Sequence, residues 1–154
     1  MEPRIIDAEI DLVPYYPDYE HTLAWYQDPE LCRQVDNIDH VYSRERLEAM
    51  YSYLCSHGSC FYIRYNGLPV GDLTLQDNGE ISIVICREYQ NRHIGRRCIP
   101  AMLALAQEKG FSEAKAVIYP FNGQSRRMFQ SAGFVKEGEK DGGELYVFRF
   151  GQDK

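Results

Sequence analysis

The segment 87–97 reads REYQNRHIGRR, which places four arginines and a histidine around Gly95 in a chain with a formal net charge of −6. A glycine-containing loop that leads into a helix exposes unpaired backbone N–H groups at the positive end of the helix dipole. Such an end binds anions, and guanidinium groups add charge-assisted hydrogen bonds to phosphate. We therefore predict a phosphate-binding loop that uses the backbone of 93–97 and the side chains of Arg92, Arg96 and Arg97. An ordinary solvated basic surface is the competing interpretation.

Two common types of phosphate-binding loop do not match this segment. A Walker loop requires Gly-Lys-Ser or Gly-Lys-Thr, and a dinucleotide-binding loop requires three spaced glycines and a following acidic residue that binds ribose. The segment 87–97 contains a single glycine and neither pattern. The sequence therefore argues against flavin or dinucleotide binding through this loop.

Short strands and helices alternate along the chain. The run 81–86 is nearly all apolar, as expected for a central strand buried on both faces. Asn66 and Gly67 form the pair that favours a tight hairpin turn. Hydrophobic spacing and helix-ending glycines predict the remaining elements. We expect strands over 4–14, 60–65, 70–76, 80–86, 113–120, 134–139 and 144–150, and helices over 17–30, 44–57, 95–110 and 122–133.

The composition predicts one soluble globular domain over residues 1–154, with 44% hydrophobic and 26% charged residues. No apolar run approaches the roughly 20 residues that span a bilayer, and the charged N-terminal segment is unlike a signal peptide. We therefore expect a cytoplasmic protein without membrane contact. The negative net charge argues against a nucleic-acid partner and mildly favours a cationic substrate. The cysteines lack metal-site spacing, so we expect no metal ion; they are Cys32, Cys55, Cys60, Cys86 and Cys98.

Two motifs on these elements resemble those of the GNAT superfamily of N-acetyltransferases. The family's acyl-CoA loop has the pattern Gln/Arg-x-x-Gly-x-Gly/Ala, and the matching positions here are Gln90, Asn91, Arg92, His93, Ile94 and Gly95. His93 replaces the first glycine, and the match holds if His93 can keep an ordinary backbone conformation with its imidazole turned outward or toward phosphate. The later segment 122–134, NGQSRRMFQSAGF, resembles the family's second motif.

The resemblance covers nearly the whole chain and implies both fold and function. It implies an α+β, GNAT-type fold with a mixed central sheet of about seven strands flanked by about four helices. It also implies transfer of an acetyl group from acetyl-CoA to a primary amine of a small molecule or a protein. A catalytically weak or inactive acyl-CoA-binding regulatory module is the alternative. Homodimers are common in the family, and this sequence does not decide the oligomeric state.

The resemblance also implies which residues contact acetyl-CoA. The backbone of Ile83, Val84 and Ile85 would pair with the pantetheine arm like an added strand, although these side chains also suit plain core packing. The loop from Gln90 to Gly95, together with Arg96 and Arg97, would hold the pyrophosphate. The remaining expected contacts come from the second motif and are Asn122, Ser125 and Phe129. Asn122 is also a good helix N-cap.

Glu80 matches a position at which many members of the family carry the carboxylate that acts as general base. We expect it to accept a proton from the ammonium substrate, and a solvated hairpin carboxylate is the equal alternative. Asp72, on the neighbouring strand, is a second candidate for binding the cationic acceptor or for sharing the role of base.

The general acid has no direct match. In much of the family a tyrosine seven residues after the motif asparagine protonates the departing thiolate, and this chain has Phe129 there. Tyr119 and Ser125 are the candidates to replace it, although Tyr119 is equally consistent with a packed tyrosine. The thiolate can also leave without a proton at some loss of rate, because thiols have a pKa near roughly 8.5.

Overall fold

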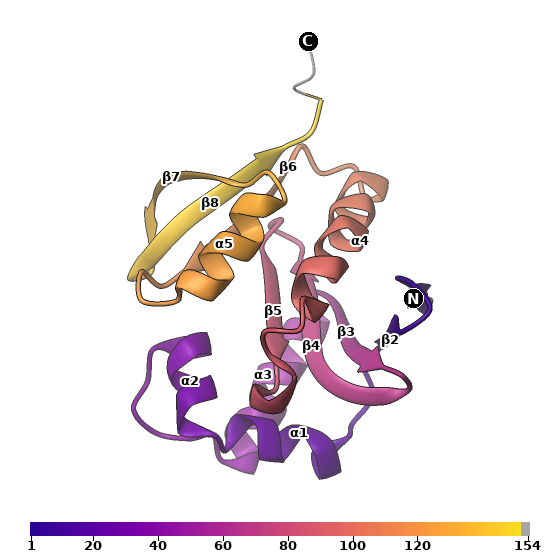
Figure 1. Cartoon of the computed structure of the whole chain (residues 1–154), viewed down its shortest axis with the longest axis vertical. Coiled ribbons are helices and arrows are strands. Elements are labelled where there is room, and N and C mark those ends of the chain that lie inside the picture. Colours follow the sequence, from indigo (N-terminus) through magenta and orange to yellow (C-terminus); the bar gives the residue numbers. More distant parts are fainter. Residues whose placement is uncertain (152–154) are drawn as a thin grey trace.

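The computed structural model describes residues 1–151, over which five α-helices surround two antiparallel sheets (Figure 1). In chain order the elements are β1 (Arg4–Ile5), β2 (Ile10–Pro14), α1 (Tyr19–Tyr26), α2 (Pro29–Asp36), α3 (Arg44–Ser56), β3 (Gly58–Tyr65), β4 (Leu68–Gln76), β5 (Ile81–Ile85), α4 (Ile94–Glu108), β6 (Glu113–Ile118), α5 (Gly123–Ser131), β7 (Val135–Lys140) and β8 (Gly143–Arg149). A short 3₁₀ helix at Arg87–Tyr89 joins β5 to the loop before α4. The expected α+β class is confirmed.

The first sheet has the order β1-β2-β3-β4-β5, with every neighbouring pair antiparallel. The predicted hairpin between β3 and β4 is confirmed, because Asn66 and Gly67 both have positive φ, at 51° and 83°. The strand predicted over 4–14 is wrong as one element. The Asp7 carboxylate accepts hydrogen bonds from the N–H groups of Glu9 and Ile10, so a turn of the kind that aspartate favours separates β1 from β2.

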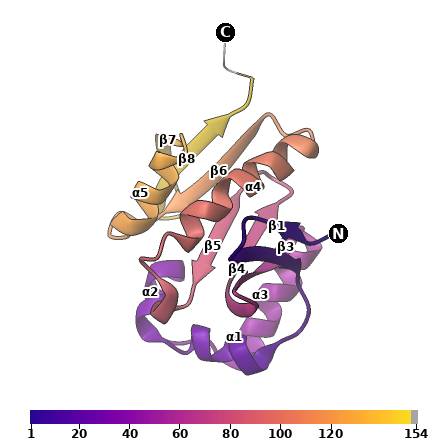
Figure 2. The ribbon, with the colours of Figure 1, turned by 45° about the vertical axis from the view of Figure 1, so that its right-hand side comes forward.

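The second sheet has the order β6-β8-β7, and it meets the first sheet at a single parallel bridge between Glu80 and Lys115. Beyond this bridge β5 and β6 separate, with β5 running toward the loop before α4 and β6 toward α5 (Figure 2). The family resemblance implied a mixed central sheet of about seven strands. The described residues form eight strands, five in one sheet and three in the other, and the parallel bridge joins the two sheets, which is close to the implied fold.

The sequence predicted one helix over 17–30, but the chain forms two helices there. Asp28 accepts hydrogen bonds from the N–H groups of Glu30 and Leu31, and Pro29 occupies the first helical position of α2. Proline suits this position because its fixed φ is helical and its missing N–H would be unpaired in any case. The Asp-Pro pair that was interpreted as the end of a helix therefore begins another one.

Helices cover both faces of the first sheet. Gly95 of α4 approaches Ile83 and Ile85 of β5 on one face. Tyr26 of α1 and Tyr51 of α3 reach Asp72 of β4 on the other face. Between these layers a continuous core of aliphatic and aromatic side chains is buried. Among residues 1–151, no helix has the length and apolar character needed to cross a membrane.

Candidate functional site

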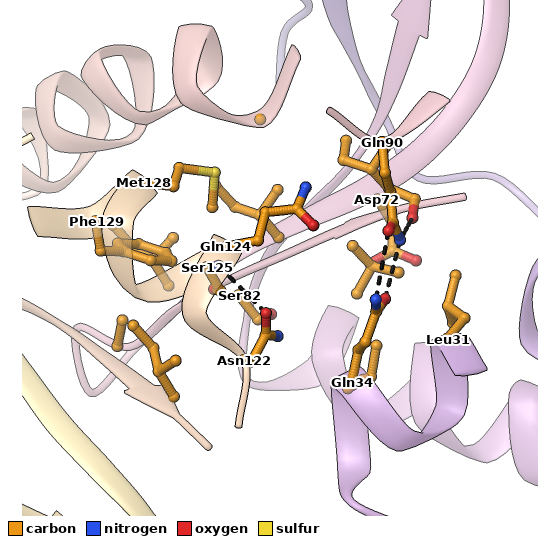
Figure 3. Close-up of a pocket in the computed structure, with 18 of the residues that line it drawn as sticks. Leu31, Gln34, Asp72, Ser82, Gln90, Asn122, Gln124, Ser125, Met128 and Phe129 are labelled. Carbon is orange, nitrogen blue, oxygen red and sulfur yellow. Dashed lines mark hydrogen bonds between the residues drawn. The ribbon is translucent and has the colours of Figure 1, made fainter. Parts of the chain in front are cut away.

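A cavity of about 570 Å³ lies where β5 and β6 separate. Its walls come from β4, β5, β6, the loop before α4, and the first turns of α4 and α5, with α1, α2 and α3 on the remaining side (Figure 3). Of the side chains that the sequence predicted for the site, all line this cavity except Arg92 and Arg97. The fold therefore brings both sequence motifs and the candidate catalytic residues to one place.

Beyond the parallel bridge between Glu80 and Lys115, the backbone of β5 presents to this cavity hydrogen-bonding groups that β4 does not use. The N–H of Gln76 donates to the carbonyl of Glu80, and the N–H of Cys86 donates to the carbonyl of Val70. Hydrogen-bonded and non-bonded pairs alternate along an antiparallel ladder. With the observed register, the residues Ile81, Ile83 and Ile85 must turn their backbone groups away from β4. An extended ligand with amide groups can pair with this edge as an added strand.

The loop before α4 has two residues in the left-handed region. Asn91 has φ of 64°, and His93, the N-cap of α4, has φ of 62°. The condition that His93 keeps an ordinary backbone conformation is therefore not met. Glycine adopts this conformation freely, whereas a side chain makes it costly, which accounts for the glycine at this position of the family pattern.

Gly95, in the first turn of α4, has a different reason to be glycine. A Cβ atom there would lie 2.9 Å from Sδ of Met128 and 3.5 Å from Cγ2 of Ile83. The absence of a side chain lets α4 approach both β5 and α5 closely. This packing fixes the N-terminus of α4 at the mouth of the cavity, and its first turn holds no acidic side chain that would repel an anion.

The arginines of the loop have separate roles. Arg96 lines the cavity and donates to Oγ of Ser131. Arg97 lies outside the cavity and pairs with Oδ2 of Asp7 at 2.6 Å and with Oε1 of Glu9 at 2.9 Å. The geometry does not support a pyrophosphate contact for Arg97, because side chains of successive residues on a helix point about 100° apart.

Arg92 also lies outside the cavity lining, with its guanidinium 4.8 Å from the centre of the Tyr89 ring. Arg127, which the sequence analysis did not select, does line the cavity from α5. The arginine pair within the second motif was the feature of the sequence that could have indicated Arg127. Arg96 and Arg127 thus supply cationic side chains to the wall formed by the two helix N-termini.

The start of α5 confirms the capping role predicted for Asn122. Its side-chain oxygen accepts a hydrogen bond from the N–H of Ser125 at 3.2 Å, as Figure 3 shows. Phe129 is buried and packs edge to face against Phe134, with ring centres 5.1 Å apart. Phe129 is therefore a core residue that also lines the cavity.

Glu80 lies just before the start of β5, and Tyr119 lies just after the end of β6. Oε1 of Glu80 lies 3.7 Å from Nζ of Lys140, and its side chain is 24% exposed. The ring of Tyr119 stacks on Phe121 with an interplanar angle of 1°. Burial raises the pKa of the Tyr119 hydroxyl above its usual value of 10, so this hydroxyl carries a proton at neutral pH.

Helix α2 crosses one side of the cavity, and its contacts were missed because the helix itself was not predicted. Gln34 and Gln90 exchange side-chain amide hydrogen bonds at 3.0 and 3.4 Å, and Nε2 of Gln90 also donates to the carbonyl of Ile85 at 2.8 Å (Figure 3). The guanidinium of Arg33 lies 4.2 Å from the centre of the Phe121 ring. Helix α2 is thereby tied to the loops that follow β5 and β6.

Asp72 lies within the first sheet and contributes to the cavity wall with a side chain that is 1% exposed. The hydroxyls of Tyr26 and Tyr51 donate to its Oδ2 at 2.7 and 2.8 Å. Burial raises the pKa of this carboxyl from 3.8 to about 6, against the opposing effect of the two tyrosine hydrogen bonds. The carboxylate form therefore predominates only above about pH 6.

The residues described, 1–151, contain no group of three or more side chains arranged to hold a metal ion. The cavity chemistry comes instead from backbone amides, two helix N-termini, two arginines, carboxylates and tyrosines. Such a set suits an anionic ligand with an amide-bearing arm on one side and a cationic group on the other.

Comparison of the sequence with known families and proteins gives two findings. A family model described as an acetyltransferase (GNAT) domain matches residues 10–135. N-acetyltransferase family 8 member 3 of Rattus norvegicus is 32% identical over 101 residues, which are 57% of this chain and 43% of that protein. The chain thus matches less than half the length of this curated relative.

Solved structures share the fold. A domain from Methanocaldococcus jannaschii DSM 2661 superimposes with a TM-score of 0.78 at 24% identity, over 93% of this chain and 99% of that one. A spermidine N-acetyltransferase from Vibrio cholerae, in complex with CoA and spermine, gives a TM-score of 0.74 at 14% identity, over 92% and 94%. At these identities the likeness concerns the arrangement of helices and strands.

Proposed function

Because the chain belongs to the GNAT acetyltransferase family, we propose that it transfers an acetyl group from acetyl-CoA to a primary amine of a small molecule or a protein. The observation that carries the proposal is the free backbone edge of β5, which faces the cavity between the N-termini of α4 and α5. We also propose that residues 1–154 form a single domain and that the protein is cytoplasmic.

The donor, acetyl-CoA, fits the wall formed by β5, α4 and α5. Its pantetheine amides would pair with the backbone of Ile83 and Ile85, in place of the missing neighbouring strand. Its pyrophosphate would lie at the N-terminus of α4, where unpaired N–H groups and Arg96 offer donors. Arg127 adds a second cation on the same side.

The transfer moves two protons from nitrogen. An ammonium acceptor gives one proton to Glu80, the proposed base, and becomes a nucleophilic amine. Its nitrogen bonds to the thioester carbonyl carbon, and the carbon–sulfur bond breaks. The N–H of Ile83 stabilises the charge on the carbonyl oxygen. Tyr119 or Ser125, the proposed donors, gives a proton to sulfur, and the second proton from nitrogen returns through water to that hydroxyl, so that only the proton on Glu80 remains to be released to solvent.

A protein that binds acyl-CoA without efficient turnover is the second candidate. Phe129 favours it, because phenylalanine cannot protonate a thiolate at the position where much of the family has tyrosine. His93 favours it too. In the family pattern this position is glycine, which lets the backbone approach the pyrophosphate closely, and here a side chain stands in that place. Measurements of binding and of turnover separate the two candidates.

Calorimetric titration with acetyl-CoA tests the donor site. We expect Arg96→Ala to weaken binding about tenfold or more, because a charge-assisted hydrogen bond contributes roughly 1.5–3 kcal/mol. The adjacent variant Arg97→Ala is the matched control, and it should bind acetyl-CoA with nearly unchanged affinity because Arg97 pairs with Asp7 and Glu9. Equal losses in both variants, or no binding by the folded parent protein, would contradict the proposed site.

Release of CoA thiol with a panel of amines then tests the chemistry. Loss of a general base lowers turnover about 100-fold or more, so Glu80→Gln should lose kcat while its affinity for acetyl-CoA stays near that of the parent. Tight binding of acetyl-CoA with no amine-dependent thiol release would support the regulatory alternative instead.

A further inference from the structure

Asp72 is a buried carboxylate that the proposed acetyl transfer does not use. Both of its hydrogen bonds, from Tyr26 and Tyr51, go to Oδ2. Within residues 1–151, Oδ1 receives no hydrogen bond and no lysine, arginine or histidine pairs with the carboxylate. Burying a charge without a counter-charge is unfavourable, and titratable groups in such a state concentrate at functional sites.

The register of the sheet places this carboxylate away from the reacting thioester. Asp72 lies opposite Val84 on β5, so its side chain shares the face covered by α1 and α3, whereas Ile83 and Ile85 point to the other face. A pantetheine arm on the free edge of β5 lies two strand spacings from β4, about 10 Å. A group held by Asp72 is therefore not the nitrogen that attacks the thioester.

Apolar side chains line the cavity on the side of α2 and α3. Leu31 and Val35 come from α2, and Met50 and Leu54 come from α3. The other carboxylates of the cavity are Asp36, Glu80 and Asp141; Asp36 pairs with Arg46 and Glu80 with Lys140, whereas Asp72 has no such cation beside it among the described residues. An aliphatic chain with a cationic end matches an apolar passage that ends at a buried carboxylate.

We propose that the acceptor is a linear aliphatic diamine or polyamine, and that Asp72 binds its second, non-reacting ammonium group. The cavity of about 570 Å³ also has to hold the pantetheine arm, so the space left for the acceptor suits a slender chain rather than a folded polypeptide segment. This inference rests on the proposed function, because acetyl transfer defines the nitrogen that reacts. Binding of the second ammonium group to Asp72 can be tested without catalysis.

The test compares acceptors of equal length that differ only at the far end. Cadaverine has a second ammonium group, 5-aminopentanol has a hydroxyl, and hexylamine has a methyl group at the same position. We expect the parent protein to prefer cadaverine over both others at least about tenfold in kcat/KM. Asp72→Asn, which keeps the size and an acceptor oxygen for the tyrosines, should abolish this preference by lowering kcat/KM for cadaverine to about the value for hexylamine.

Asp77→Asn is the matched control, because Asp77 is exposed in the turn after β4, outside the cavity. It removes the same charge and should keep the preference for cadaverine. Titration of cadaverine into the CoA-bound protein gives a second readout that needs no catalysis. Binding should depend on Asp72 and not on Asp77.

The outcomes separate the two proposals. No preference for cadaverine in the parent protein, or a preference that survives in Asp72→Asn, overturns the diamine site while acetyl transfer still stands. Asp72-dependent binding of cadaverine without thiol release from any amine supports the site and overturns the proposed activity. Absence of both binding and turnover overturns both. The comparison of acceptors in the parent protein remains decisive if the Asp72 variant does not fold.

Discussion

At the scale of single residues, the buried Asp72 carboxyl couples folding to pH. Its folded-state pKa of about 6 lies above its usual value of 3.8, so the folded protein binds the proton more tightly than the unfolded chain. The stabilising contribution is complete below about pH 4 and is lost as the pH rises through about 6, a change of about 3 kcal/mol.

Urea unfolding of the parent protein and of Asp72→Asn at several pH values measures this contribution. The difference between the two free energies of unfolding cancels the contributions of the other titratable groups. We expect the variant to gain stability relative to the parent by about 3 kcal/mol between about pH 4 and about pH 8. A difference that does not change with pH would show that Asp72 titrates in the folded state as it does in the unfolded chain.

Residue types at fixed spacing predicted most of the residues that line the cavity. The direction in which each side chain points did not follow from spacing alone. Gln90, Gly95 and Asn122 line the cavity because each lies beside a strand end or a helix start that the sequence pattern predicted. Arg97 could not be separated from Arg96, because the carboxylates that bind it come from the turn between β1 and β2. The left-handed conformation of His93 was hidden for a similar reason, since histidine rarely signals positive φ.

At the scale of elements, the pairing of β4 with β5 depends on Gly71. A Cβ atom at this position would lie 2.1 Å from the carbonyl oxygen of Val84, which is backbone and cannot move aside. We expect Gly71→Ala to lower the free energy of unfolding by about 2–3 kcal/mol or more. Because the same pairing places Asp72 and the free edge of β5, weaker binding of acetyl-CoA should accompany the loss.

Gly138→Ala provides the matched control, because a Cβ atom there would have no neighbour within 4 Å and the residue lacks positive φ. Its stability should stay within about 0.5 kcal/mol of the parent protein in the same denaturant titration. A Gly71→Ala protein as stable as this control would contradict the close approach of the two strands.

The missed helix α2 illustrates the limit of local signals. Asp-Pro both ends one helix and begins another, and only the capping contacts of Asp28 distinguish these roles. The contacts of Gln34 and Arg33 with the loops after β5 and β6 depend on that helix, so they could not be predicted either. The strongly patterned elements β5, α4 and α5 were predicted because periodicity and capping agree there.

At the scale of the whole molecule, the separation of the two sheets predicts where a bound donor would protect the backbone. In hydrogen exchange, the amides of Ile83 and Ile85 should slow markedly when CoA is added, because within residues 1–151 they have no partner in a β-ladder. The amides of Ser82 and Val84 belong to the ladder with β4 and should exchange slowly in both states. Exchange at Ile83 that does not respond to CoA would contradict pairing of the pantetheine arm with β5.

The contact between the two sheets was the part of the fold that the sequence predicted least well. Each strand was predicted from its own residues, but no local pattern reports that β5 and β6 touch only at Glu80 and Lys115. The number of strands in one sheet depends on long-range pairing, whereas the existence of each strand depends on nearby residues. The α+β class was therefore predictable, and the division into five-stranded and three-stranded sheets was not.

The strands β2 and β3 are antiparallel neighbours, yet the chain between them contains α1, α2 and α3 instead of a short turn. The segment 15–57 is in this sense an insertion into a hairpin, and it lines one side of the cavity without taking part in the first sheet. If acetyl-CoA binds as proposed, the donor side comes from β5, α4 and α5, all of which follow β4. Exchange of the segment 15–57 between related proteins would then change the wall that faces the amine while the proposed donor site and Asp72 on β4 stay as they are.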